Sequence, residues 1–314
     1  MSWMRRESVL WRLPVIAALA IVINGRVLPS QSVSDIARPA TLLADDSWPE
    51  VKLNVVVFDR HGVPQNVDER EFRLFEDGAE RPLQFRDSQD SPVSLALMID
   101  SSGSIFKSKD AIITAVKAIV RGLPDNSEVM AVVFSNLAFL DLPFTPVSKI
   151  DYSFLDRLQA RGPTGLYDAV VATENHIIAN AKYARRALVI LSDGENNASQ
   201  VSIGVVYRAM EHPGAPVVYA CRVSKASLLI PNDSAVGHIN MKFLAKEGGG
   251  AEFSLDPDPE AAAAQIAKAI RSQYVLRFTA ADPTRDGKAH KLAVRIPVKD
   301  VQIHVLPVYR APSK

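Results

Sequence analysis

The chain has 314 residues, of which 47% are hydrophobic and 23% charged, so it can bury a sizeable core and does not belong to the disordered or low-complexity classes. Lysine and arginine (36) nearly balance aspartate and glutamate (35), and no dense basic run occurs, which argues against a nucleic-acid partner. A single cysteine, Cys221, excludes an intrachain disulfide, a Cys-rich zinc site and a Cys-ligated iron–sulfur cluster. Its strand-like surroundings predict a small buried apolar residue rather than a nucleophile.

Residues 1–32 have the pattern of a secretory signal peptide. Arg5, Arg6 and Arg12 precede an apolar run at 13–23, which is shorter than the roughly 20 residues that a membrane-spanning helix needs. The alternatives are a buried core helix and an uncleaved anchor, and no small-x-small cleavage site follows the run. We therefore expect export to the periplasm or the extracellular space, with no membrane span in the mature chain.

The next part, residues 33–49, contains two prolines and no sustained period, which predicts a linker into the folded body.

Two segments at the ends of the folded body, 50–91 and 274–311, have the alternating pattern of β-strands. In the first, Asp77-Gly78 lies between apolar alternations and predicts a hairpin; in the second, Asp286-Gly287 does the same. Neither segment can close a core alone, because isolated hairpins are only marginally stable. We therefore predict that the two segments pair into one small β-sandwich, and that the middle of the chain is inserted in it.

The middle of the chain, 92–273, alternates short apolar runs with helical periods, which is typical of βαβ units around a mostly parallel sheet. The expected strands are 94–100, 128–135, 187–192, 216–223 and 251–255. The expected helices are 105–123, 151–160, 166–181, 202–210, 238–249 and 259–273. Asp258 is the expected N-cap of the last helix, with Pro259 at its first position. The segment 137–145 is expected to be an antiparallel edge strand, because Pro143 is excluded from a sheet centre.

Polar residues follow the strands of this middle part. Asp100, Ser102 and Ser104 stand at the carboxyl end of its first strand, where open α/β sheets place their ligand sites. Thr164 lies in the loop RGPTG before a later helix, and Asp193 ends another apolar strand. We expect these three loops to meet at one edge of the sheet. Taken alone, Asp-x-Ser-x-Ser also fits a strand-to-helix turn in which Ser104 caps the next helix.

The stretch from about Pro92 to Gln273 resembles a von Willebrand factor A (VWA) domain that carries a metal-ion-dependent adhesion site (MIDAS). The phrases FRLFEDG, TGLYDA and QYVLRFT extend the likeness over 50–311, to VWFA-related proteins that bacteria export. The resemblance implies an α/β, Rossmann-like fold. It also implies one divalent ion, held by Asp100, Ser102, Ser104, Thr164 and Asp193. Gly165 departs from the small non-glycine residue that is usual in the family, which is expected to loosen the Thr164 loop.

Two carboxylates and three hydroxyls form an oxygen-only set, which favours a hard cation such as Mg²⁺, with Mn²⁺ or Ca²⁺ as competitors. Because hydroxyls donate little charge, the ion stays electrophilic and keeps an open position. In the VWA family that position is usually filled by a Glu or Asp side chain of a partner protein. We therefore expect a monomeric, non-catalytic interaction or adhesion module. Glu195 follows Asp193 and could lie near the ion, but we expect it to open a helix or a loop. Asp168 could orient Thr164, but we expect it to interact with the dipole of the helix whose first turn it occupies.

Two alternatives remain at this stage. One is a metal-dependent hydrolase or phosphotransferase on a Rossmann-like sheet, with Asp100 as the nucleophile. Such phosphotransferases usually carry a second acid two residues on, where this chain has Ser102, and the chain contains no Gly-x-Ser-x-Gly elbow and no phosphate-binding Gly-x-x-x-x-Gly-Lys loop. The other is a VWA domain without an ion, which binds partners through other surfaces.

Overall fold

A computed structural model describes residues 22–23, 26–27, 48–85, 91–159, 161–223 and 233–313. The chain divides into two compact units, Met1–Gln31 and Ser32–Lys314. In the first unit, the short strands β1 (Val22–Ile23) and β2 (Arg26–Val27) pair antiparallel. Most of the expected signal peptide and all but the last two residues of the expected linker lie outside the described residues.

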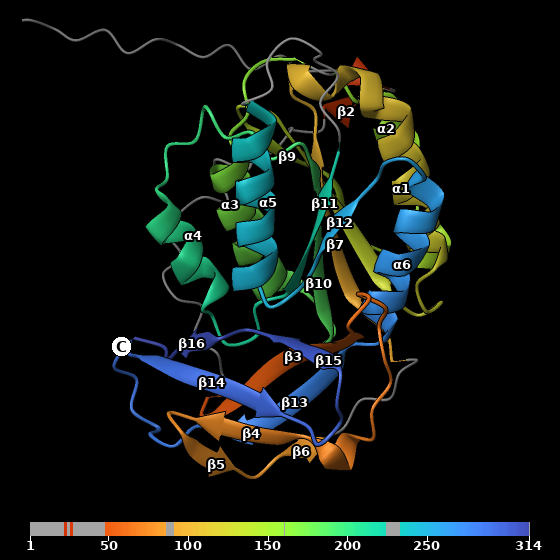
Figure 1. Cartoon of the computed structure of the whole chain (residues 1–314). Coiled ribbons are helices and arrows are strands. Elements are labelled where there is room, and N and C mark those ends of the chain that lie inside the picture. Colours follow the sequence, from red (N-terminus) through yellow and green to blue (C-terminus); the bar gives the residue numbers. More distant parts are fainter. Residues whose placement is uncertain are drawn as a thin grey trace, which may run out of the picture. The chain divides into compact units, whose positions relative to one another are not determined.

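The centre of the second unit is a six-stranded sheet with the order β12-β11-β10-β7-β8-β9 (Figure 1). Its strands are β7 (Ser94–Asp100), β8 (Glu128–Phe134), β9 (Ala138–Pro146), β10 (Arg186–Ser192), β11 (Val217–Arg222) and β12 (Glu252–Ser254). Every neighbouring pair is parallel except β8 and β9. The expected antiparallel edge strand is therefore confirmed.

Helices cover both faces of this sheet (Figure 1). One face carries α1 (Lys109–Arg121), α2 (Ser153–Asp156) and α6 (Pro259–Arg271), and the other carries α3 (Leu166–Asn180), α4 (Ile203–Met210) and α5 (Asp233–Glu247). Successive strand residues point to opposite faces. In β7, Leu95 and Leu97 enter the core under α1 and α6, while Ala96 and Met98 enter the core under α3 to α5.

Two four-stranded antiparallel sheets form a smaller β-sandwich, with the orders β15-β3-β13-β6 and β16-β14-β4-β5. The strands before the α/β region are β3 (Glu50–Asp59), β4 (Arg73–Glu76), β5 (Ala79–Arg81) and β6 (Gln84–Phe85). Those after it are β13 (Tyr274–Thr279), β14 (Ala289–Arg295), β15 (Val301–Val305) and β16 (Val308–Arg310). Each sheet mixes strands from both segments, so the expected fold class, an α/β unit inserted in a β-sandwich, is confirmed.

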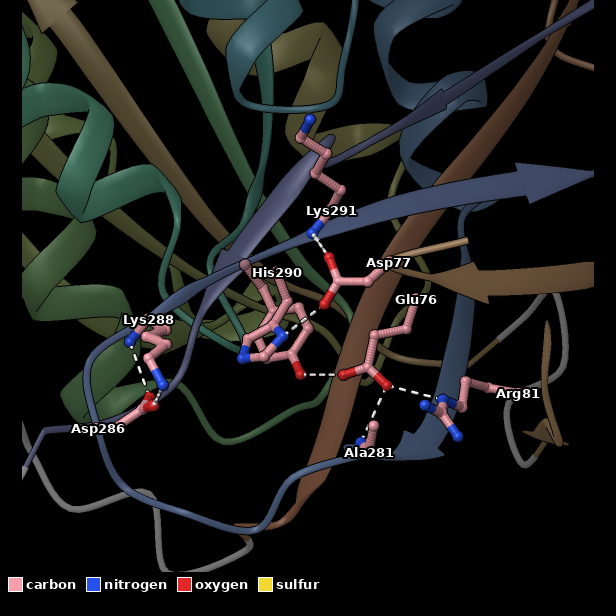
Figure 2. A network of polar contacts seen from close by, with 9 residues as sticks. Glu76, Asp77, Arg81, Ala281, Asp286, Lys288, His290 and Lys291 are labelled. Atoms are coloured by element: carbon pink, nitrogen blue, oxygen red, sulfur yellow. Dashed lines mark hydrogen bonds and ion pairs between the residues drawn. The ribbon is translucent and has the colours of Figure 1, made fainter. Parts of the chain in front are cut away.

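A polar network joins the two sequence segments that build the sandwich, the one before and the one after the α/β region (Figure 2). Glu76, at the end of β4, is 1% exposed, and its carboxylate accepts hydrogen bonds from the backbone N–H of Ala281 (2.9 Å) and the hydroxyl of Tyr309 (2.5 Å). Next to it, the Asp77 carboxylate lies 2.8 Å from Nδ1 of His290. A third bond to Glu76 comes from Arg81 of the N-terminal segment (2.7 Å), but Ala281, Tyr309 and His290 belong to the C-terminal segment, so their bonds favour the observed pairing over other arrangements.

The structure corrects three expected helices. The helix expected at 238–249 is α5, which begins earlier, at Asp233. The helix expected at 151–160 ends at Asp156, and the one expected at 105–123 starts as a 3-10 turn (Gly103–Ser108) before α1 begins. Further 3-10 turns lie at Glu69–Glu71 and Val147–Lys149.

Cys221 is fully buried in β11, and burial raises the pKa of its thiol to about 12, which fits the expected apolar role. None of the helices within the described residues combines the length and the apolar composition that are needed to cross a membrane.

Candidate metal centre

The expected site residues lie where the strand order of the central sheet reverses. From β7 the chain continues to β8 on one side, whereas β10, the other neighbour of β7, leads to β11 on the other side. The helices that follow these strands, α1 and α4, lie on opposite faces of the sheet. In open α/β sheets, ligands bind at such a divergence, outside the carboxyl ends of the strands. Asp100 is the last residue of β7, and Asp193 directly follows β10.

Asp100 is fully buried and held from both sides. Its Oδ1 accepts a hydrogen bond from the backbone N–H of Ser102 (2.8 Å), and its Oδ2 accepts one from the hydroxyl of Ser192 (2.6 Å). The Ser192 hydroxyl accepts in turn from the backbone N–H of Gly194 (3.0 Å). Burial raises the pKa of Asp100 to about 6, against the lowering effect of these hydrogen bonds and with a further increase from the nearby Asp193 carboxylate.

Asp193 is 6% exposed, and its two carboxylate oxygens differ in their hydrogen bonding. Oδ1 accepts a hydrogen bond from the backbone N–H of Glu195 (3.0 Å), whereas Oδ2 is buried and has no hydrogen-bond partner within the described residues. A buried carboxylate oxygen without a partner is costly. In the first loop, the hydroxyls of Ser102 and Ser104 lie 3.2 Å apart. This edge of the sheet therefore holds two neighbouring acids, Asp100 and Asp193, and one oxygen of Asp193 has no hydrogen-bond partner within the described residues.

The Thr164 loop is hydrogen-bonded to both other loops. The backbone N–H of Thr164 donates to Oδ1 of Asn197 (2.7 Å), and its carbonyl accepts from the N–H groups of Asn197 and Ala198 (2.9 Å each). On the other side, the N–H of Gly103 donates to the carbonyl of Gly162 (3.1 Å). The three loops that the sequence analysis singled out are thus held together at one edge of the sheet.

Gly165 is tied to the turn that follows β8. Its N–H donates to the carbonyl of Ser135 (2.7 Å), and a Cβ at this position would lie only 3.3 Å from the carbonyl oxygen of Asn136. Glycine allows the two backbones to approach this closely. The loop backbone is therefore hydrogen-bonded at Gly165, the position where the sequence departs from the pattern that the resemblance predicts.

The candidate site residues fit a hard divalent cation. Within the described residues no three His, Cys, Asp or Glu side chains gather to hold a metal, so an ion here would need hydroxyl ligands beside Asp100 and Asp193. A small cation of charge +2 would satisfy the unpartnered Oδ2 and relieve the repulsion between the carboxylates. The role of Asp100, Ser102, Ser104, Thr164 and Asp193 as its ligands stays a prediction.

Three residues that support the site were not identified in these roles from the sequence. Ser192 binds Asp100, and Asn197 binds the backbone of Thr164. Asp168 lies in the first turn of α3, as expected, but its carboxylate accepts hydrogen bonds from the backbone N–H groups of Gln200 and Val201, and so positions the third loop. The only signal in the sequence is the polar density of SDGENNAS, which does not reveal the partner of each side chain.

No protein-family model matches the chain, and none of the curated proteins matches it. Similar solved structures include an aerotolerance-related membrane protein from Bacteroides fragilis (18% identity, 57% of this chain and 98% of that chain, TM-score 0.43). They also include the conserved hypothetical protein BatB from Bacteroides thetaiotaomicron (19%, 57% and 100%, TM-score 0.45). A third is a von Willebrand factor type A protein from Catenulispora acidiphila (13%, 84% and 74%, TM-score 0.46). At these identities the likeness concerns the fold alone.

Proposed function

We propose that this protein is an exported, non-catalytic binding module that captures an acidic side chain of a partner protein through a divalent cation, preferably Mg²⁺. The ion is held by Asp100, Ser102, Ser104, Thr164 and Asp193. One observation carries the proposal: Oδ2 of Asp193 is buried without a partner, beside the equally buried Asp100. An opposite charge at this point offsets the cost of burying both carboxylates.

The composition of the site favours ligand binding. When bound, the ion supplies a Lewis-acidic position that attracts an anionic oxygen. Two carboxylates neutralise its charge of +2, and hydroxyl ligands add no further negative charge. Ser192 and Asn197 hold the Asp100 and Thr164 groups in place, as outer-shell residues do in other metal sites.

The arrangement of Asp100 favours a ligand over a nucleophile. Both of its oxygens already accept hydrogen bonds, and it is fully buried. Ser102 stands where a phosphotransferase would carry its second acid, and its hydroxyl faces that of Ser104. We therefore favour the binding role over the hydrolase or phosphotransferase. The basic and apolar pattern of residues 1–32 supports export.

Calorimetric titration of the full chain with Mg²⁺ tests the proposal. We expect one ion to bind, and Asp100→Ala to weaken binding by more than about 100-fold, because the loss of an outer-shell partner alone costs about 10- to 100-fold. Asp282→Ala serves as the matched control, since Asp282 is an exposed aspartate of the sandwich segment, and it should bind Mg²⁺ like the wild type. Lack of Mg²⁺ binding in the wild type, or unchanged binding in a folded Asp100→Ala, contradicts the proposal.

A further inference from the structure

Large apolar side chains are exposed around the candidate metal centre. Among the described residues, the four most exposed are Phe106 (70%), Ile239 (64%), Val236 (60%) and Leu137 (53%). We call these four residues the apolar rim. Scattered exposed apolar residues are common on protein surfaces, so the position of the four decides their meaning.

Two members of the apolar rim lie on the first two loops of the site. Phe106 belongs to the 3-10 turn Gly103–Ser108 and follows Ser104 by two residues. Leu137 lies in the turn after β8, where its carbonyl accepts a hydrogen bond from the N–H of Ser135 (2.9 Å). The carbonyl of Ser135 accepts from Gly165, the neighbour of Thr164. Both side chains therefore stand on backbone that is bonded to the candidate ligand loops.

The other two members lie on the N-terminal half of α5, which packs against the third loop. Nδ2 of Asn240, on α5, donates a hydrogen bond to the carbonyl of Gly194 (2.8 Å), which follows Asp193. Gly194 and Gly237 approach so closely that a Cβ on Gly194 would lie 2.1 Å from the carbonyl oxygen of Gly237. Val236 and Ile239 flank Gly237 on this helix, which lies alongside the sheet in Figure 1. The apolar rim thus comes from three elements that meet at the site.

We infer that the apolar rim is the docking surface for a protein segment in which an acidic side chain is flanked by large apolar side chains. The inference rests on the proposed function: the carboxylate occupies the open position of the ion, and its neighbours bury against Phe106, Leu137, Val236 and Ile239. An apolar surround excludes water from the central charged contact and so strengthens it.

Charge favours a protein segment over a lipid surface as the occupant. The ion would keep one open, Lewis-acidic position, which a single carboxylate of a partner can fill. Around Phe106 the charged residues are mixed, with Lys107 and Lys109 beside Asp110. Attraction to anionic lipids requires clusters of about four to eight basic residues. The surface therefore combines a position for one anionic oxygen with an apolar surround, which matches an acidic residue between apolar ones.

Labelled peptides with a central acidic residue test the inference by fluorescence anisotropy with the Mg²⁺-loaded full chain. One set places Asp or Glu between two Leu or Phe residues, a second set replaces the flanking residues by Ser, and a third replaces the acid by its amide. We expect the apolar-flanked acids to bind at least about tenfold more tightly than the Ser-flanked acids. The amide set should not bind.

Variants of the apolar rim separate this inference from the proposed function. Phe106→Ser and Leu137→Ser should each weaken binding of the apolar-flanked peptides about tenfold and leave Mg²⁺ affinity unchanged. Val298→Ser is the matched control, because Val298 is an exposed valine between β14 and β15 of the sandwich (41%), and it should change neither affinity.

Each other outcome overturns the inference in a distinct way. Equal affinity for apolar-flanked and Ser-flanked acids rejects the apolar rim but leaves the metal site standing, while loss of Mg²⁺ binding in the wild type rejects both. Failure of every peptide to bind a Mg²⁺-loaded chain rejects the acidic segment as occupant. Dimerisation in sedimentation equilibrium that Phe106→Ser abolishes assigns the surface to a second copy. Binding to phosphatidylcholine–phosphatidylglycerol vesicles that Phe106→Ser abolishes assigns it to a membrane.

Discussion

At the scale of single residues, Glu174 in α3 is a buried ionisable group. Its side chain is fully buried, and neither carboxylate oxygen has a hydrogen-bond partner within the described residues. Burial raises the pKa of Glu174 to about 8, from an ordinary value of 4.5. The folded protein therefore keeps this carboxyl protonated at neutral pH, whereas the unfolded chain ionises it.

We predict that the free energy of unfolding falls as the pH rises from 4.5 to about 8, because a raised folded-state pKa stabilises the fold fully only below the unfolded value. Over this window, the titration of Glu174 should lower the free energy of unfolding by up to about 1.4 kcal/mol per pH unit. Glu174→Gln removes the titration, so its stability relative to the wild type should increase with pH. Urea unfolding of both proteins at pH 5 and pH 8, in the presence of a chelator, measures the difference. An equal difference at the two pH values contradicts the assignment.

At the scale of elements, periodicity predicted most helices but not the end of α2. The expected helix at 151–160 stops at Asp156 because the following segment must reach the sheet edge that carries the candidate site. There the N–H of Arg161 donates to the carbonyl of Ser101 (2.8 Å), and Gly162 adopts a positive φ of 76°. No pattern within the segment itself predicts this bond, because its partner lies about 60 residues away in the sequence.

The helix α6 begins as predicted. The Asp258 carboxylate accepts hydrogen bonds from the N–H groups of Glu260 (3.1 Å) and Ala261 (3.0 Å), and Pro259 occupies the first position. Asp258→Ala should lower the free energy of unfolding by about 1 kcal/mol, because two N–H groups lose their acceptor. Asp258→Ser keeps a capping oxygen and should lose much less. Denaturant unfolding compares the two variants, and equal losses would show that the cap is not the source of the stability.

At the scale of the whole folded unit, the turn between α5 and β12 contacts the sandwich. Gly249 has a φ of 66°, and a Cβ there would lie 2.5 Å from the backbone nitrogen of Leu306, in the connection between β15 and β16. Nearby, Nδ1 of His304 is hydrogen-bonded to the carbonyl of Gly250, and the N–H of Arg310 donates to the carbonyl of Glu211 (2.7 Å). The inserted α/β region and the sandwich therefore share backbone contacts beyond their two chain crossings.

We predict that Gly249→Ala destabilises the protein by about 2 to 4 kcal/mol, since it adds a clash between backbones to the strain of a left-handed alanine. Gly62→Ala is the matched control: Gly62 also has a positive φ of 76°, but a Cβ there would meet nothing within 4 Å, so only about 1 kcal/mol should be lost. Thermal unfolding of both variants gives the difference. Equal losses would mean that contact between the sandwich and the α5–β12 turn adds nothing to stability.

Much of the fold was predictable because its signals are local. Apolar runs such as 94–100 and 187–192 indicate buried parallel strands, and Asp258-Pro259 indicates the start of a helix. The sandwich required one further argument, that two half-sized β segments cannot each close a core. That argument identified which segments pair, but not that β3 lies between β13 and β15.

The sequence by itself determined the residue types at the candidate site and their places at the ends of strands, since strand period and the Asp-x-Ser-x-Ser spacing are properties of neighbouring residues. Only the tertiary structure decided that Ser192 holds Asp100, that Oδ2 of Asp193 is buried without a partner, and that Phe106 and Leu137 share an edge with them. These features depend on burial and on contacts between segments far apart in the chain, and both arise only when the strands have been ordered in the sheet.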